Sequence, residues 1–248
     1  MTTPRLASVA AIALAALGTA CASGSTTSSA SAADAAFYGG GIQVGPATGS
    51  TLPLTKIDEI KHVAGVKTAF ATYRFDAGTG RLQPAGIATT DSIVASDPTE
   101  AAWSGLKTDY AQGHAIDADS SGEVVLGAAI ANEFRKKIGD SIELPANPAG
   151  GAARHSFTVV GVLGVTNTGP DRFAYVNITD GQMLLKDSLP PGQIQQVDVA
   201  AVATAIDVYA KSGTTIDELD KIADQINQQV AGVIAIKPSR LVDSLKHA

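Results

Sequence analysis

Apolar residues recur along this 248-residue chain at two different spacings, and each spacing predicts a different kind of element. Recurrence every three or four residues predicts helices over 55–64, 128–138 and 216–230. The signal is clearest in the last of them, because Thr215 and Glu218 have the spacing of a capping box directly ahead of the apolar stripe. We therefore expect three amphipathic helices, each with its apolar face in a core.

The two shorter helices carry weaker signals at their ends. Thr55 is expected to cap the first helix, and Gly65 is expected to end it. In the second helix, Ile130, Phe134 and Ile138 recur every four residues, which predicts that all three are core positions. Single helical turns are expected over 180–185 and 241–246.

Short runs of β-branched and aromatic residues predict the strands. The ranges expected as strands are 42–44, 66–75, 82–89, 123–127, 141–144, 157–165, 173–176, 204–210 and 233–236. A turn over 78–80 is expected to join 66–75 to 82–89 as a hairpin, whereas 93–119 has no clear pattern. The run over 157–165 is apolar on both faces, which favours a central strand. Irregular alternation of strands and helices predicts an α+β fold.

The N-terminus has the pattern of an export signal. After Arg5, residues 6–17 form an uncharged run of twelve, whereas a spanning helix needs about 20 apolar residues. Cys21, the only cysteine, follows small residues at 18–20. This arrangement resembles a bacterial lipoprotein signal, although Gly18 stands where that family usually has leucine. The resemblance implies that residues 1–20 are removed and that Cys21 receives a lipid; ordinary secretory cleavage and an uncleaved anchor are the alternatives.

Residues 21–40 are rich in Ser, Thr, Ala and Gly, and they predict a flexible tether between the lipid and a folded domain over 41–248. Apolar residues make up 45% of the chain and charged residues 17%, as in globular proteins. A net charge of −6 and few aromatic residues argue against a nucleic-acid partner. The expected location is therefore extracytoplasmic, with the membrane as a partner through the lipidated N-terminus.

No arrangement of residues predicts catalysis, a cofactor or a metal site. Asp117 and Asp119 begin like a calcium loop, but no glutamate closes it at the EF-hand spacing, so a solvated turn is expected. His114 and His155 are expected to be ordinary surface residues, and Trp103 to be a packing residue. We therefore expect a protein that is not an enzyme.

Three segments in a fixed order resemble the extracytoplasmic core domain of MacB-like and FtsX-like permeases, the membrane subunits of ABC-type systems. They are Val124–Gly127 ahead of the helix that starts at Ala128, then Gly139–Leu144, and then Phe157–Leu163. The resemblance implies a two-lobed α+β domain with a mixed sheet. One porter-like lobe would comprise 41–89 and 198–248, and a second lobe, 90–197, would be inserted into it.

The family's permeases have a spanning helix before this domain and three after it, whereas here a lipoprotein-like signal precedes it. We therefore expect a free-standing, membrane-tethered copy of the domain. It would act as a non-catalytic interaction module of an ABC-type export or envelope system, bound to envelope or ABC-permease proteins. A lipid-anchored protein that binds a solute or a lipid is the alternative, and an envelope hydrolase ranks below both.

Overall fold

The computed structural model describes residues 41–82, 88–104, 109–145, 154–166, 169–190 and 192–240. The expected signal, tether and Cys21, as well as the helical turn expected over 241–246, lie outside these residues. None of the helices in the described ranges combines the length and the apolar character that crossing a membrane requires.

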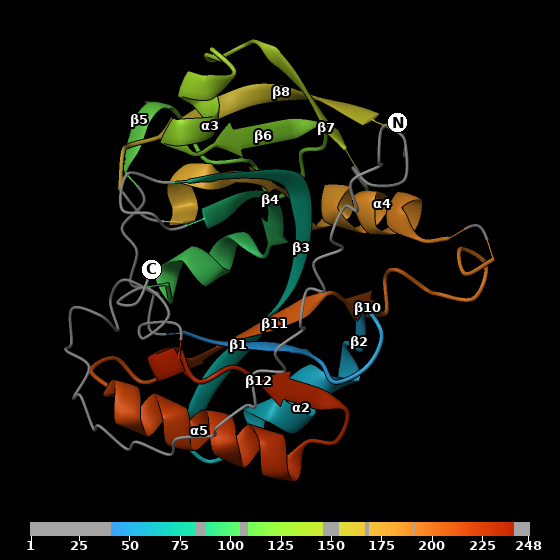
Figure 1. Cartoon of the computed structure of the whole chain (residues 1–248), viewed down its shortest axis with the longest axis vertical. Coiled ribbons are helices and arrows are strands. Elements are labelled where there is room, and N and C mark those ends of the chain that lie inside the picture. Colours follow the sequence, from blue (N-terminus) through green and yellow to red (C-terminus); the bar gives the residue numbers. More distant parts are fainter. Residues whose placement is uncertain are drawn as a thin grey trace, which may run out of the picture.

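A ten-stranded mixed sheet runs through the molecule in the order β12-β1-β11-β3-β4-β9-β6-β8-β5, with β7 also paired to β8 (Figure 1). Its strands are β1 (Gly41–Pro46), β3 (Val66–Leu82), β4 (Ala88–Ser96), β5 (Tyr110–Gly113), β6 (Glu123–Leu126), β7 (Ser141–Pro145), β8 (Arg154–Leu163), β9 (Phe173–Val176), β11 (Ala205–Ala210) and β12 (Val233–Ala235). The β4–β9 and β6–β8 pairs are parallel and the others antiparallel. Strands β2 (Leu52–Pro53) and β10 (Val202–Ala203) form a separate pair. The predicted α+β class is confirmed, and β8 has neighbours on both edges, as a central strand should.

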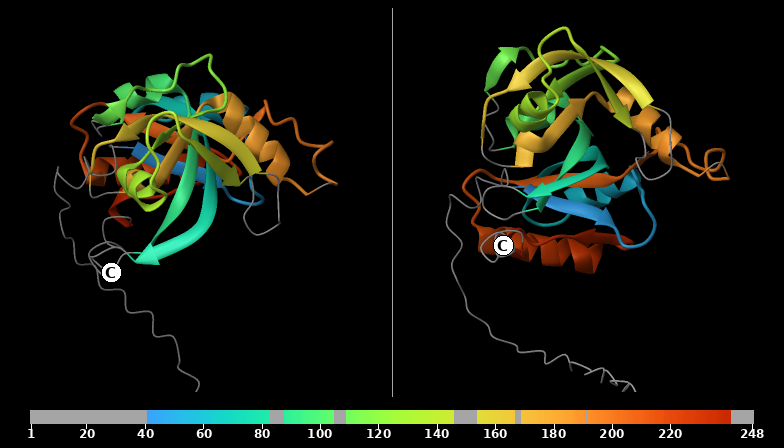
Figure 2. Two further views of the ribbon diagram at one scale, coloured as in Figure 1. Left: turned by 90° about the horizontal axis from the view of Figure 1, so that it is seen from above. Right: turned by 45° about the horizontal axis from the view of Figure 1, so that its top comes forward.

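Helices cover the sheet in two groups, one in each half of the molecule (Figure 1). Helices α2 (Thr55–Lys61) and α5 (Ile216–Gln229) pack near β1, β11 and β12. Helices α3 (Ala128–Glu133) and α4 (Ile178–Ser188) belong to the other half, and Figure 2 shows the two groups from further sides. Two short 3-10 helices, η1 (Pro98–Ala102) and η2 (Gly169–Arg172), complete the described elements.

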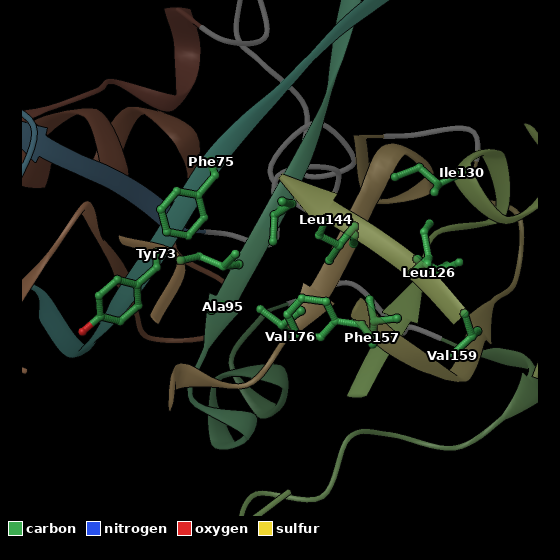
Figure 3. Packing of buried hydrophobic residues seen from close by; sticks show 14 of the residues in the cluster. Tyr73, Phe75, Ala95, Leu126, Ile130, Leu144, Phe157, Val159 and Val176 are labelled. Atoms are coloured by element: carbon green, nitrogen blue, oxygen red, sulfur yellow. The ribbon is translucent and has the colours of Figure 1, made fainter. Parts of the chain in front are cut away.

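Two clusters of buried apolar side chains correspond to these halves. The α5 core contains residues of α2, α5 and β1, and includes Ala69 of β3. The β8 core, drawn in Figure 3, includes Tyr73 and Phe75 of the same strand β3 together with residues of β6, β8 and α4. Strand β3 therefore supplies side chains to both cores.

The capping box predicted for α5 is confirmed, but the helix-end predictions for α2 and α3 are wrong. Leu54 occupies the cap position of α2 without a capping side chain, and Thr55 is already helical. Helix α3 stops at Glu133 because Arg135 adopts a left-handed conformation with φ of 52°. The expected helical stripe therefore breaks, and Phe134 and Ile138 are 48% and 40% exposed and are not core residues.

The predicted hairpin exists, but its turn is not where the glycines suggested. Strand β3 continues through residues 78–80 to Leu82, and its antiparallel partner β4 begins at Ala88. The pairing shifts register between Asp76 and Gly80. An irregularity of this kind absorbs extra residues within a strand, so the glycines interrupt the ladder without reversing the chain.

Candidate functional site

A buried polar cluster lies where the two halves meet, between β3, β11 and η1. Thr72 and Arg74 lie two residues apart on β3, and Asp207 and Tyr209 lie two apart on the paired strand β11. Side chains two apart on a strand point to the same face, which brings all four together. Helix η1 adds Glu100; Asp97 starts that helix by accepting a 2.8 Å hydrogen bond from the Thr99 backbone N–H.

Short polar contacts join these side chains. The Arg74 Nη2 lies 2.9 Å from Asp207 Oδ2, which also accepts a 3.0 Å hydrogen bond from the Thr72 hydroxyl. The Tyr209 hydroxyl donates to Glu100 Oε1 at 2.6 Å. Since Thr72, Glu100, Asp207 and Tyr209 are all buried, the cluster attaches η1 to β11 with little access for water.

Burial and two carboxylates in proximity change the proton affinities within this cluster. Burial, reinforced by Asp207, raises the pKa of Glu100 to about 7, although the Tyr209 hydrogen bond opposes this change. Burial also raises the pKa of the Tyr209 hydroxyl, and the negative charges of Glu100 and Asp207 raise it further. For Arg74, burial alone would lower the pKa, but the Asp207 carboxylate outweighs it, so the guanidinium stays charged. The groups bind one another, which is the arrangement of a structural junction.

A second buried ion cluster connects three elements of the β8 half. Arg172 of η2 forms an ion pair with Asp91 of β4, and its Nη1 lies 3.0 Å from Glu133 Oε2 of α3. Arg172 and Asp91 are both almost completely buried. A buried arginine that bridges two carboxylates fixes the elements that carry them.

The structure does not bring the polar residues considered from the sequence together. No hydrogen bond or ion pair within the described ranges joins any two of His114, His155, Asp117 and Asp119, and these ranges hold no group of three candidate metal ligands. His114, Asp117 and Asp119 are exposed, as expected. Trp103 is 38% exposed, so it is only partly a packing residue.

His155 differs from the sequence-based prediction. Its Nε2 lies 2.7 Å from Asp187 Oδ2 of α4, and only 24% of its side chain is exposed. The pair connects the start of β8 to helix α4. The prediction of an ordinary surface histidine is therefore wrong, because the partner comes from an element that sequence spacing does not place beside it.

A surface with apolar and basic side chains lies at the β5 end of the β8 half, and the sequence analysis missed it. We call it the α3–β5 surface; its residues are Tyr110, Phe134, Arg135, Lys136, Lys137 and Ile138. Tyr110 is 40% exposed, similar to Ile138. The three consecutive cations at 135–137 in an acidic chain could have indicated an exposed surface here. The helical spacing of Phe134 and Ile138 instead led to the prediction that both are core residues.

Comparison with known proteins places the chain in a family. The family model described as the MacB-like periplasmic core domain matches residues 6–226, a range that begins at the first residue of the apolar run near the N-terminus. No curated protein sequence matches the chain.

Solved structures with a similar fold are distant in sequence. The extracellular domain of the noncanonical ABC-type transporter YknZ from Gram-positive bacteria is 15% identical, with 79% of this chain and 99% of that one covered and a TM-score of 0.44. The periplasmic region of MacB from Actinobacillus actinomycetemcomitans is 12% identical, with coverages of 86% and 95% and a TM-score of 0.47. A domain of a putative permease from Porphyromonas gingivalis is also 12% identical, with coverages of 81% and 91% and a TM-score of 0.42.

Proposed function

Because the chain belongs to the family of MacB-like periplasmic core domains, which are extracytoplasmic, non-catalytic domains associated with ABC transporters, we propose that it is a docking module. It would bind envelope or permease proteins of an ABC-type export or envelope system. The family match over residues 6–226 is the observation that carries this proposal. The buried polar groups around Arg74 and Arg172 bind one another within the protein, so they have a structural role in this proposal.

The two-lobed organisation expected from the sequence is part of the proposal. The porter-like lobe would comprise 41–89 and 198–248, and the inserted lobe would comprise 90–197. The α5 core supports this division, because it draws on both ends of the described chain, including Ile42 and Ala235. The β8 core draws mainly on the residues between them. Strand β3 belongs to both cores, so the lobes would share one sheet.

Co-purification of the full chain from its own host tests the docking function. The chain, expressed from its own locus with a C-terminal tag, is crosslinked in cells and isolated from detergent-solubilised membranes. We expect a permease or ATPase subunit of an ABC-type system among the crosslinked proteins. Isolation of the chain with a bound solute or lipid and without any such subunit would instead support the alternative of a lipid-anchored binding protein.

We propose further that Cys21 carries the lipid that holds the chain at the membrane. It is the only thiol and directly follows the export-signal pattern. Cells are grown with an alkyne-labelled fatty acid, and label incorporation and membrane fractionation in high salt are compared for wild type, Cys21→Ser and the neighbouring control Ser23→Ala. We expect only Cys21→Ser to lose the label and leave the membrane. A Cys21→Ser chain that remains with membranes would favour an uncleaved anchor.

A further inference from the structure

The α3–β5 surface combines exposed apolar side chains with consecutive positive charges. Phe134 and Ile138 are 48% and 40% exposed, and three consecutive cations, residues 135–137, lie between them in the sequence. The chain as a whole has a net charge of −6, so this short segment opposes the overall sign. Figures 1 and 2 show α3 and β5 at the same end of the molecule, far from α5.

Backbone hydrogen bonds hold this segment firmly against β8. The Gly139 N–H donates to the Val159 carbonyl at 2.8 Å, and the Val159 N–H donates to the Asp140 carbonyl at 2.9 Å. Lys136 Nζ donates to the Ser141 carbonyl at 2.6 Å, and the Lys137 N–H donates to Asp140 Oδ2 at 3.0 Å. The backbone that carries the surface is therefore tied to β7 and β8, and ordering it adds little to the entropic cost of binding.

Ile138 is positioned by direct contact with strand β5. A Cβ added at Gly113, which has a φ of +75°, would lie 2.7 Å from Ile138 Cδ1. Tyr110 of the same strand lies against Gly161 of β8, 3.2 Å from where a Cβ would stand there. Gly113 and Gly161 thus leave room for the side chains of Ile138 and Tyr110 beside the sheet.

Arg135 occupies a backbone conformation that favours glycine. Its φ of 52° makes it the only non-glycine residue with positive φ in the described ranges, and it directly follows the C-cap residue of α3, where glycine is the usual choice. A left-handed conformation costs most residues about 1 kcal/mol or more relative to glycine. The residue that ends α3 is therefore an exposed cation at a position where glycine would serve the backbone better.

At the opposite edge of the sheet, the described strand β12 carries one exposed apolar residue and no run of cations. There the Asn227 side chain bonds both backbone groups of Ala235 in β12, through 2.7 Å and 3.0 Å hydrogen bonds. Ile234 is 51% exposed on that strand, but a single exposed apolar residue is ordinary for a soluble surface. The edge at β12 is therefore a suitable internal control.

We propose that the α3–β5 surface is the docking site for an acidic protein surface with a small apolar centre. This proposal rests on the proposed docking function and adds where on the chain the partner would bind and which kind of surface it would present. Carboxylates of the partner would face Arg135 and Lys137, while its apolar centre would cover Phe134 and Ile138. Arginine and aromatic residues are enriched at protein interfaces. A protein is the occupant that the proposed docking function favours, and binding to a bilayer is one outcome of the test below.

Site-specific photocrosslinking in cells tests this assignment. p-Benzoylphenylalanine replaces Phe134 in the full chain, and replaces Ile234 in the matched control. We expect a crosslink to another protein from position 134 and none to that protein from position 234. The crosslinked peptide of the partner should be rich in Asp and Glu. Lys137→Glu should reduce the crosslink roughly fivefold or more, because like charges would then face each other. The control Lys221→Glu, on α5, should leave it unchanged.

Arg135→Gly separates binding from folding. This change removes a cation and also relieves the left-handed strain, so we expect the melting temperature to stay the same or rise while the crosslink weakens.

The assignment is wrong if the product crosslinked from position 134 is heavier than the chain by the mass of one lipid or by the mass of a second copy of this chain. It is also wrong if positions 134 and 234 crosslink the same protein equally, or if Lys137→Glu leaves the yield of the crosslink unchanged. If an ABC-type subunit still co-purifies with Lys137→Glu at wild-type yield, this surface is wrong and the docking function stands. If the crosslink depends on charge but no ABC-type subunit co-purifies, the α3–β5 surface is a docking site and the proposed association with an ABC-type system is wrong.

Discussion

The buried carboxyl of Glu100 should make the domain less stable as the pH rises through neutrality. Burial and the nearby Asp207 raise the pKa of Glu100 from 4.5 to about 7. An acid with a raised pKa in the folded chain binds its proton more tightly there than in the unfolded chain. The penalty for ionising it is therefore absent below pH 4.5 and complete above pH 7. At about 1.4 kcal/mol per tenfold change in proton affinity, the full penalty is about 3 kcal/mol.

Glu100→Gln should remove this penalty while preserving the contact with Tyr209. The glutamine carbonyl oxygen can accept the hydrogen bond that Glu100 Oε1 accepts at 2.6 Å. We expect the variant to differ from wild type by less than about 1 kcal/mol at pH 5 and to be more stable by up to about 3 kcal/mol at pH 8. Urea-induced unfolding followed by circular dichroism at pH 5, 6, 7 and 8 measures the difference in unfolding free energy.

The control for this experiment is Glu143→Gln, because the Glu143 carboxylate is well exposed. Its difference from wild type should not change over the same pH range. A constant difference between wild type and Glu100→Gln from pH 5 to pH 8 would refute the reasoning, since it would mean that Glu100 ionises as easily in the folded chain as in the unfolded one.

Three further substitutions test other parts of the structure by the same unfolding assay. Gly181→Ala should lower the free energy of unfolding by about 1–3 kcal/mol, because the new Cβ would lie 2.4 Å from the Cβ of Ala95 and α4 would have to move. An unchanged free energy of unfolding would mean that α4 lies further from the sheet. Arg172→Met should cost about 3–5 kcal/mol by removing the cation that the buried Asp91 faces, and a loss below about 1 kcal/mol would contradict a buried pair. His155→Ala should cost about 1 kcal/mol through the lost contact with α4, whereas an exposed histidine would cost less than about 0.5 kcal/mol.

Features determined by neighbouring residues could be predicted from the sequence. The α5 helix is an example, because Thr215 and Glu218 lie within one turn and their mutual hydrogen bonds were implied by their spacing. Strand β8 was predicted at its place in the chain, but Thr158 is exposed and Val160 is half-buried, so its apolar run is not covered on both faces. The family resemblance rested on the same kind of information, namely the order of local segments.

Features determined by distant residues could not be predicted. Thr72 and Asp207 are 135 residues apart, and Glu100 and Tyr209 are 109 apart, so their contacts follow only from the order of the strands. Phe134 was misassigned for a different reason: the helical period continues in the sequence after the backbone has left the helix. A single residue with positive φ produced that break, and no local pattern announced it.

Strand β3 has a mechanical consequence for any partner that pulls on this domain. Around Thr72 it is paired to β11 on one edge, where Thr72 faces Ala205, and to β4 on the other, where Thr72 faces Ser96. Residues of β3 before Thr72 pair with β11 and residues after it pair with β4, so the two ladders overlap at this one position. A force that passes between the two halves along β3 therefore crosses a point at which the strand exchanges one partner for the other.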